Sequence, residues 1–250
     1  MSKAVSITTT VVVLVLIILG AWYFMASRPT TQSYAPTNSG ATTNSTQSQV
    51  KGTMYITITD AAVNMQNITK VDMTVDKIEA YSPAQGWVTL SSNSQTFNLL
   101  ELKAKGQTAL LAKIDVPADT YSQIRLHVAQ ILVTESGEVK EAKVPSNEFK
   151  IMADVAVRGN ANSVARFDIL ADKSVHKTGK GEFIFTPVIK FDSSSDVAVQ
   201  VGVDNMVTVS GGNANASANF GMDINGQVKQ DFMLDTSATL TVTGGVIEIK

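Results

Sequence analysis

The sequence TMYITIT, from Thr53 to Thr59, holds the pattern that decides the fold. Met54, Ile56 and Ile58 alternate with threonine and tyrosine, and this period of two is typical of a β-strand that buries one face. The stretch therefore predicts a half-buried strand at the start of a β-rich domain.

The next apolar run changes phase in its middle. Val71, Met73 and Val75 lie on one phase, and Ile78 begins a run on the opposite phase. A shift of one residue turns the later side chains away from the core, unless an extra residue restores their direction. The pair Asp76-Lys77 is therefore predicted to form a β-bulge.

Comparable short strands recur up to Phe191, separated by turns and without an amphipathic helix between them. This pattern predicts an antiparallel sandwich or barrel. We expect an all-β fold, an antiparallel β-sandwich of the immunoglobulin or transthyretin-like type. Apart from the N-terminal segment, helix is limited to one turn near 99–102.

The run 182–191 is predicted to be a strand of this sandwich. Pro187 lacks an N–H, which predicts a sheet edge or a bulge at that point. His176, upstream of the run, is predicted to lie in a solvent-facing loop. The residues on one phase of the run are all apolar and are expected to face the core: Phe183, Phe185, Pro187, Ile189 and Phe191.

Ahead of this domain, residues 4–27 contain no charged side chain. As a helix, these 24 residues reach about 36 Å, which exceeds a hydrocarbon core about 30 Å thick. Trp22 and Tyr23 occupy the place of an interfacial aromatic belt. We expect residues 1–28 to form an uncleaved transmembrane signal-anchor, with a cleaved signal peptide as the alternative.

Residues 29–50 are rich in Ser, Thr, Asn and Gln and hold almost no aliphatic side chain. Such a segment buries too little apolar surface to fold, so it is predicted to be a disordered, flexible linker. Ser/Thr-rich stalks of this kind are typical of the cell exterior. We therefore expect a single-pass cell-membrane protein with its N-terminus in the cytoplasm and its C-terminal domain outside.

Charge and cysteine content exclude several partners. Residues 29–250 hold 18 basic and 22 acidic side chains, a net charge of −4, without a basic patch. This argues against nucleic acid as a partner. The absence of cysteine excludes disulfides, thiol nucleophiles and thiolate metal sites. The domain must be held by its apolar core, which a chain of this length allows.

The tail, residues 193–250, is predicted to add strands to the main domain at 51–192 or to form a small second β-unit. The valines between 197 and 203 alternate as in a strand, whereas residues 211–218, rich in Gly, Asn and Ala, are predicted to be a loop.

Six segments, in order and with similar spacings, resemble one family. They are TITDA at Thr57–Ala61, VDKIEAYS at Val75–Ser82, GWVTL at Gly86–Leu90, FNLLEL at Phe97–Leu102, VPADTYSQIRLHV at Val116–Val128 and ADKSVHKTGKGEFIFTPVIK at Ala171–Lys190. Over about residues 51–191 the chain resembles domain of unknown function family 4382 (DUF4382). The resemblance implies a β-rich domain of a prokaryotic exported or membrane-anchored protein, with no assigned activity. VPADTYSQIRLHV also resembles the final strand of transthyretin-like surface modules.

Few residues suggest catalytic chemistry. His127 and His176 are the two histidines, and neither belongs to a HExxH motif or a close histidine pair that would hold zinc. Ser174, His176 and Asp172 lie close in sequence, but no nucleophile elbow accompanies them. We expect no metal, no cofactor and no enzymatic activity.

Lys173, His176, Lys177 and Lys180 form a small basic loop. It is the candidate ligand-binding site, suited to an acidic glycan or a phosphate. The alternative is a solvated hairpin tip, which is the common place of charged side chains.

Two function classes stay open. One is a non-catalytic surface binding or adhesion module for a carbohydrate or an envelope polymer. The other is a structural cell-envelope protein that self-associates. Exposed aromatic side chains on one sheet face favour the first class, and an unpaired apolar edge strand favours the second.

Overall fold

The computed structural model describes residues 49–61, 65–235 and 239–249. The expected anchor at 4–27 and all but the last two residues of the expected linker lie outside these ranges. Within them, no helix has the length and apolar character needed to cross a bilayer.

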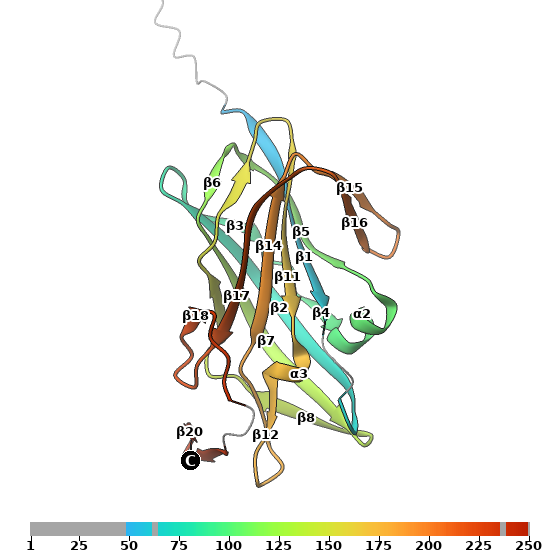
Figure 1. Ribbon diagram of the computed structural model, residues 1–250, viewed down its shortest axis with the longest axis vertical. Coiled ribbons are helices and arrows are strands. Elements are labelled where there is room, and N and C mark those ends of the chain that lie inside the picture. Colours follow the sequence, from blue (N-terminus) through green and yellow to red (C-terminus); the bar gives the residue numbers. More distant parts are fainter. Residues whose placement is uncertain (1–48, 62–64, 236–238, 250) are drawn as a thin grey trace, which may run out of the picture. The chain divides into compact units, whose positions relative to one another are not determined.

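β-Strands dominate the described residues, as predicted, and most of them belong to two large sheets (Figure 1). The first sheet has six strands in the order β18-β17-β14-β11-β1-β5. Their bounds are β1 (Lys51–Asp60), β5 (Ala109–Pro117), β11 (Asn162–Ile169), β14 (Val188–Ser195), β17 (Asn213–Met222) and β18 (Val228–Gln230).

The second sheet has eight strands. β12, β13, β8, β7, β2 and β3 follow one another, while β4 pairs with β2 and β9 pairs with β7. Their bounds are β2 (Ile68–Ser82), β3 (Gly86–Ser91), β4 (Gln95–Asn98), β7 (Gln123–Glu135), β8 (Glu138–Lys143), β9 (Glu148–Ile151), β12 (Val175–Lys177) and β13 (Phe183–Phe185).

Smaller elements complete the described chain. β6 (Asp119–Tyr121) pairs with β10 (Val155–Val157), β15 (Ala198–Val201) with β16 (Val207–Ser210), and β19 (Leu240–Thr243) with β20 (Val246–Ile249). The helices are short: α2 (Leu99–Lys105), at the predicted helical turn, and α3 (Ala171–Ser174).

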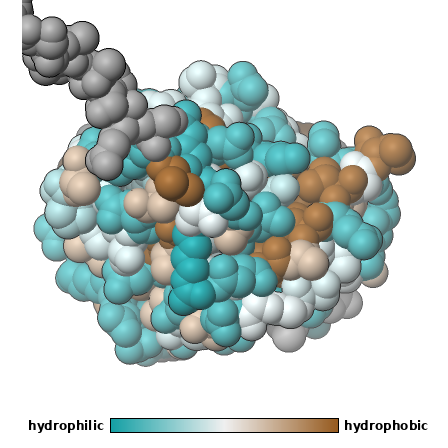
Figure 2. Space-filling view, turned by 90° about the horizontal axis from the view of Figure 1, so that it is seen from above, coloured by the Kyte–Doolittle hydropathy of each residue, from teal (hydrophilic) through white to brown (hydrophobic). Residues whose placement is uncertain are grey.

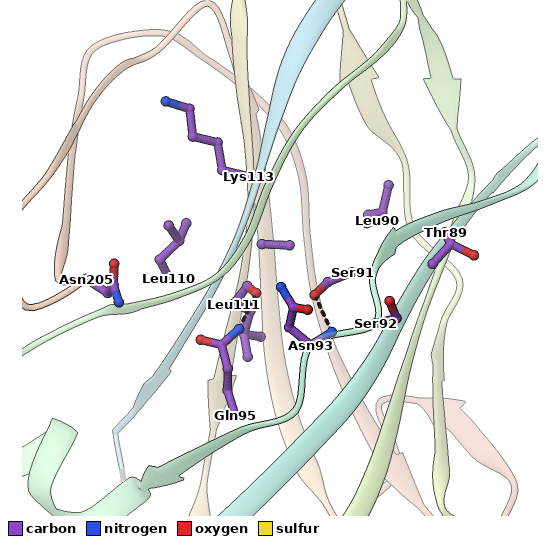
Figure 3. Close-up of a pocket in the computed structure, with 11 residues that line it drawn as sticks. Thr89, Leu90, Ser91, Ser92, Asn93, Gln95, Leu110, Leu111, Lys113 and Asn205 are labelled. Atoms are coloured by element: carbon purple, nitrogen blue, oxygen red, sulfur yellow. Dashed lines mark hydrogen bonds between the residues drawn. The ribbon is translucent and has the colours of Figure 1, made fainter.

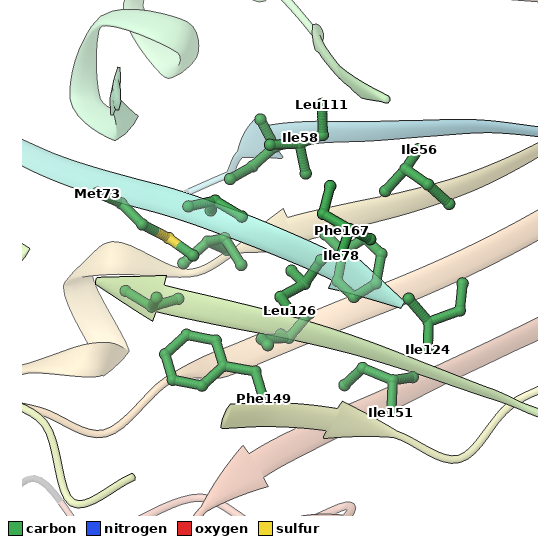
Figure 4. Packing of buried hydrophobic residues seen from close by; sticks show 14 of the residues in the cluster. Ile56, Ile58, Met73, Ile78, Leu111, Ile124, Leu126, Phe149, Ile151 and Phe167 are labelled. Carbon is green, nitrogen blue, oxygen red and sulfur yellow. The ribbon is translucent and has the colours of Figure 1, made fainter. Parts of the chain in front are cut away.

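One hydrophobic core takes side chains from both large sheets (Figure 4). Ile56 of β1 and Phe167 of β11 come from the six-stranded sheet; Met73 of β2, Leu126 of β7 and Phe149 of β9 come from the other, and all five are fully buried. Burying a side chain of this kind contributes about 1.5–3 kcal/mol relative to exposure. The core therefore provides the stability that a chain without cysteine cannot take from disulfides.

β1 is buried on both faces, so the prediction of a half-buried strand was wrong. Met54, Ile56 and Ile58 face the main core as expected, but Tyr55 on the other face is also buried. Tyr55 belongs to a separate apolar cluster with Val164 and Val197, against which the half-buried side chains of Leu110 and Val199 pack. Residues from the tail thus cover the outer face of β1, which the local pattern could not indicate.

The predicted β-bulge in β2 is confirmed. Against β7, Val75 pairs with Val128 and Lys77 pairs with His127, so Asp76 is the extra residue. Val75 and Ile78 on either side are both buried. The bulge therefore does what the change of phase requires, which is to keep the apolar side chains of one long strand on the core side.

Two strand pairs are parallel, which corrects the expectation of an antiparallel sandwich. β1 runs parallel to β11, and β13 runs parallel to β8. Parallel neighbours need a long crossover connection. Between β1 and β11 that connection contains most of the eight-stranded sheet, and side-chain alternation does not encode so distant a partner.

The run 182–191 crosses from one sheet to the other. Its predicted core face is buried: Phe183, Phe185, Ile189 and Phe191 are at most 1% exposed. Pro187 lies between β13 and β14, so the prediction of a sheet edge or bulge at this residue was wrong. Proline has no N–H to donate to a neighbouring strand. A residue that connects two sheets does not need this hydrogen bond, which explains why proline fits there.

The other face of this run is buried as well. Ile184 packs in a small apolar cluster with Leu234, Leu240 and Ile247, which brings β19 and β20 against β13. Thr186 and Val188 are also buried. The C-terminal hairpin β19–β20 therefore covers part of this face.

The tail contributes to the six-stranded sheet. Residues 213–218, within the predicted loop, form the first part of β17, which pairs with β14. Asn, Ala and Ser are weak strand formers, but the pairing with β14 outweighs this preference. The β15–β16 hairpin leaves Val201, Val203 and Val209 exposed. Figure 2 shows hydrophobic surface gathered on the side where Figure 1 has this hairpin.

Phe185→Ala is expected to lower the free energy of unfolding by about 3–5 kcal/mol, the usual range for a buried phenylalanine. The ring is fully buried and stacks on Phe149, with 6.4 Å between the ring centroids. Equilibrium urea unfolding of the full-length protein measures the loss. Val139→Ala is the control, because Val139 is 62% exposed and its truncation should change stability by less than about 0.5 kcal/mol. Equal losses in the two variants would contradict this placement of the core.

Candidate functional site

The four residues of the predicted basic loop lie in three different local structures. Lys173 belongs to α3, His176 and Lys177 belong to β12, and Lys180 lies in the turn between β12 and β13. Nearness in sequence therefore does not give these side chains a common environment.

Lys177 is already occupied by a protein partner. Its ammonium group lies 2.6 and 2.7 Å from the two carboxylate oxygens of Glu135, which comes from β7. It also lies 5.8 Å from the centre of the Phe183 ring. Lys177 is thus held by a structural ion pair and is not a free cation for a ligand.

His176 is half-buried, so the prediction of a solvent-facing loop histidine was wrong. β12 pairs with β13, where His176 lies opposite Ile184. The imidazole Nε2 is 2.8 Å from the hydroxyl oxygen of Thr186, a hydrogen-bond distance. Burial lowers the pKa of the His176 imidazole below the usual value for histidine. These contacts give the side chain a structural position between neighbouring strands.

Lys180 has basic neighbours that the sequence analysis did not find. It lines a cavity of about 400 Å³ together with Lys140 and Lys143 of β8. Glu141 and Glu182 line the same cavity, so carboxylates accompany the ammonium groups. The Lys143 ammonium group also donates a hydrogen bond to the carbonyl of Gly245. This mixed lining does not form a concentrated anion site.

The other histidine also has a protein partner. His127 Nδ1 lies 2.5 Å from a carboxylate oxygen of Asp76, the bulged residue of β2. Among the described residues, no group of three or more histidine, aspartate or glutamate side chains is arranged to hold a metal ion.

An aromatic side chain marks the outer face of the eight-stranded sheet. Trp87 lies on β3, an edge strand, and is 39% exposed. Within the described ranges it is the single aromatic residue with more than a third of its surface exposed. Tyr81 lies opposite Trp87 on β2, with 5.4 Å between the ring centroids. The two rings form a small aromatic surface at the sheet edge.

Arg125 supports this aromatic surface from β7. Its guanidinium carbon is 4.0 Å from the centre of a Trp87 ring, a cation–π distance. Carboxylate oxygens of Glu79 and Glu148 lie 3.7 and 3.4 Å from the guanidinium group and restrain it. The Arg125 side chain is 22% exposed and its Nε is buried. The guanidinium group therefore stacks on the indole, and Trp87 keeps 39% of its surface exposed.

A cleft of about 400 Å³ lies between β3 of one sheet and β5 of the other (Figure 3). Both are edge strands. Its apolar lining is Leu90, Leu110, Leu111 and Ala112. No carboxylate side chain is among the described residues that line it. The polar lining consists of hydroxyl and amide side chains with one lysine: Thr89, Ser91, Ser92, Asn93, Gln95, Asn205 and Lys113.

Hydrogen bonds fix the walls of the cleft. The side-chain amide of Gln95 donates to the carbonyl of Leu111 at 2.8 Å and so bridges the two sheets (Figure 3). The backbone N–H of Asn93 donates to the Ser91 hydroxyl at 3.2 Å. Lys113 places its ammonium group 5.5 Å from the centre of the Tyr55 ring. The Gln95–Leu111 hydrogen bond therefore joins the two sides of the cleft.

A family model described as domain of unknown function (DUF4382) matches residues 51–187, more than half of the chain. The chain is a member of the DUF4382 family. The resemblance found in the sequence is thereby confirmed. No curated protein and no solved structure gives a significant match to the chain.

The DUF4382 match contains the aromatic surface and nearly the whole cleft. Trp87 and Arg125 lie within it, and Asn205 is the one lining residue beyond it. The match ends at Pro187, immediately before β14. β14 nevertheless pairs with β11, so strands C-terminal to the match complete the six-stranded sheet.

Sequence reasoning missed both surfaces. GWVTL contributed only to the family resemblance, because the exposure of a tryptophan depends on which strands flank it. The cleft could not be predicted, since it joins residues of two sheets that are distant in sequence. The signal available in advance was an uncharged run of hydroxyl and amide side chains at Ser91–Gln95.

His176 is expected to make the DUF4382 domain less stable in mild acid. Its pKa is lowered in the folded state by burial, so the unfolded state takes up a proton first as the pH falls. The contribution of His176 to the free energy of unfolding is fully present above the pKa of about 6.5 that histidine has in the unfolded chain. It is lost as the pH falls below that value. Urea unfolding near pH 7.5 and near pH 5 measures this loss.

His176→Gln, which cannot take up this proton, is expected to lose less stability between these pH values than the wild type. Lys173→Gln is the control, because it removes a charge at an exposed position of the same segment and should behave as the wild type does. An unchanged pH dependence in His176→Gln would contradict the burial of this imidazole.

Proposed function

We propose that this DUF4382 protein is a non-catalytic surface binding module for a glycan or a carbohydrate-containing envelope polymer. The observation that carries the proposal is Trp87, an exposed indole on the outer face of the eight-stranded sheet. Exposed aromatics on a sheet face are the feature that favours carbohydrate binding over a purely structural role. The basic loop is not part of the proposed site, because Lys177 and His176 have protein partners.

The chemistry of the aromatic surface suits a sugar ring. An aromatic face carries negative partial charge, and the C–H groups on one side of a pyranose carry positive partial charge, so the two attract when stacked. Arg125 stacks on the indole, and the part of Trp87 that stays exposed is available to a ligand. The Tyr81 ring contacts the indole, and the carboxylates of Glu79 and Glu148 restrain the Arg125 guanidinium group. A preorganised surface of this kind loses little conformational entropy on binding.

A protein partner is less consistent with this surface. Stable protein interfaces bury about 800 Å² on each side around a water-excluding apolar centre. Here one exposed aromatic residue is surrounded by paired charges, including Glu79 with Lys77 and Glu148 with Arg125. A flat polar ligand with one apolar face fits this composition better.

We also propose that the domain is held at the outer surface of a cell membrane. Residues 4–27 support an uncleaved anchor, because they are apolar and uncharged over the length of a bilayer. The Ser/Thr-rich residues 29–50 and the absence of cysteine-based lipidation agree with this arrangement. The N-terminus is then cytoplasmic and the DUF4382 domain extracytoplasmic.

The finer fold type is likewise a proposal. Two sheets around one core support a sandwich of the immunoglobulin or transthyretin-like type. The parallel pair β1–β11 is a departure from the purely antiparallel pattern of such sandwiches.

The second candidate is a structural envelope protein that self-associates through β5. An edge strand presents backbone groups with which another chain can pair. Part of this edge is already occupied, because Leu110 donates to the carbonyl of Asn205 and the Leu111 carbonyl accepts from Gln95. The binding module is therefore the first choice.

Trp87→Ala is expected to weaken glycan binding at least about tenfold, which corresponds to about 1.4 kcal/mol. The full-length protein, in a detergent without a sugar head group, is screened on a glycan array, and the hits are titrated by calorimetry. Val139→Ala, which removes exposed apolar surface elsewhere, should bind as the wild type does. Unchanged binding by Trp87→Ala, or no binding of any glycan, would count against the proposal.

Protease added to intact cells that carry the full-length protein is expected to release a fragment starting between residues 29 and 50. An uncharged, Ser/Thr-rich linker outside the membrane is open to cleavage, whereas the β-rich domain resists it. Mass spectrometry of the supernatant locates the cut. Release only after the cells are lysed would contradict the proposed topology.

A further inference from the structure

The cleft between β3 and β5 adjoins the aromatic surface. Thr89 lines the cleft and lies two residues after Trp87 on the same strand, and both side chains are exposed. Alternate residues of a strand point to the same face and are about 7 Å apart. A chain of sugar rings that leaves the indole along β3 therefore reaches the cleft within its next residues.

The lining of the cleft favours a neutral ligand with hydroxyl and amide groups. Each asparagine amide offers both N–H donors and a carbonyl acceptor, and each hydroxyl offers both functions. Within the described residues, the side-chain amide of Asn93 has no protein partner. Lys113 is the one charged lining residue, and its ammonium group lies against the Tyr55 ring.

The apolar part of the lining adds a further requirement. Leu110 is the half-buried apolar side chain beside these amides (Figure 3), whereas Leu90 and Leu111 are core residues that are at most 5% exposed. A ligand that carries a small apolar group beside an amide satisfies both parts of the lining. The acetamido group of an N-acetylated amino sugar has this chemistry, with one N–H, one C=O and one methyl group.

An added peptide strand fits the cleft less well. Strand addition needs a row of free backbone N–H and C=O groups along an edge. At β5 the N–H of Leu110 and the carbonyl of Leu111 are already bonded, to the Asn205 backbone and the Gln95 side chain. Side chains, not free backbone groups, are what this cleft presents.

We infer that the cleft is a second subsite, which binds an N-acetylated amino-sugar residue of a neutral glycan while a residue farther along the same glycan chain, beyond the reach of a disaccharide, stacks on Trp87. This inference rests on the proposed function and extends it. It assigns the ligand class as an N-acetylated oligomer that spans both surfaces, so a single sugar occupies only part of the site.

Chain length provides the first test. The probes are N,N′-diacetylchitobiose and chitohexaose, which are β-1,4-linked N-acetylglucosamine oligomers, and cellohexaose, which has the same linkage without acetamido groups. The full-length protein in a detergent without a sugar head group is titrated by calorimetry. Chitohexaose is expected to bind at least about tenfold more tightly than the disaccharide and more tightly than cellohexaose.

Variants of the cleft provide the second test. Asn93→Ala and Asn205→Gly each remove one amide, and glycine suits position 205 because its φ is +60°. Each should weaken chitohexaose binding about fivefold, the effect of one lost hydrogen bond, and leave disaccharide binding unchanged. Trp87→Ala should weaken both ligands. Unchanged urea unfolding midpoints show that the variants are folded.

Fluorescence shows which surface each ligand touches. In the Trp22→Phe background, Trp87 is the sole tryptophan of the chain. Both chito-oligosaccharides should change its emission, and Asn93→Ala should preserve the change caused by the disaccharide.

Three outcomes would overturn the inference in distinguishable ways. If Trp87→Ala abolishes binding while the cleft variants bind chitohexaose as the wild type does, the cleft is not a subsite, although the proposed function stands. Equal affinity for chitohexaose and cellohexaose likewise removes the assignment to N-acetylated sugars. If no glycan binds, both the inference and the proposed function fall.

Discussion

The burial of two sheet faces against one another is the interaction on which the rest of this molecule depends. The chain has no cysteine, so the core between the six-stranded and eight-stranded sheets supplies the stability of the domain. This arrangement also limits where a ligand can bind, because the inner faces of both sheets are buried in the core. The outer face of β1 is closed as well, since residues of the tail pack over Tyr55. Candidate binding surfaces therefore lie on the outer face of the eight-stranded sheet and at the open edge between the sheets.

Charge pairing shapes the character of these surfaces. Around Trp87, the positive charge of Arg125 is compensated by Glu79 and Glu148, and the guanidinium group stacks on the indole. Charge is also compensated in the predicted basic loop, where Lys177 forms an ion pair with Glu135. Paired charges of this kind contribute little net stability at a surface, but they fix side-chain geometry. The surface around Trp87 is thus nearly neutral, which agrees with an uncharged polymer better than with a phosphate or an acidic glycan.

The family match and the folded unit do not have the same boundaries. The match stops before β14, yet β14 lies between β11 and β17 in the six-stranded sheet. Gly221 of β17 shows how closely the tail is packed, because a Cβ atom there would lie 2.1 Å from the carbonyl oxygen of Phe232. The C-terminal strands are therefore part of the folded unit, and the turn between β15 and β16 contributes Asn205 to the lining of the cleft.

The sequence by itself determined the local features. The period-two pattern indicated the strand class and the core faces of β1 and of the run 182–191, and the change of phase in β2 located the bulge at the pair Asp76-Lys77. The six family segments were also readable without a structure. These features depend on neighbouring residues, because the direction of a side chain along a strand is set by a count of residues.

Only the tertiary structure decided which strands pair and what covers their outer faces. The parallel partner of β1, the strand role of residues 213–218, the burial of His176 and the exposure of Trp87 all depend on segments distant in sequence. The cleft is the extreme case, since it exists only where the edges of two sheets face each other. Alternation specifies the face that a strand buries. It does not specify its neighbour, because the backbone hydrogen bonds that join two strands are the same for nearly every residue type.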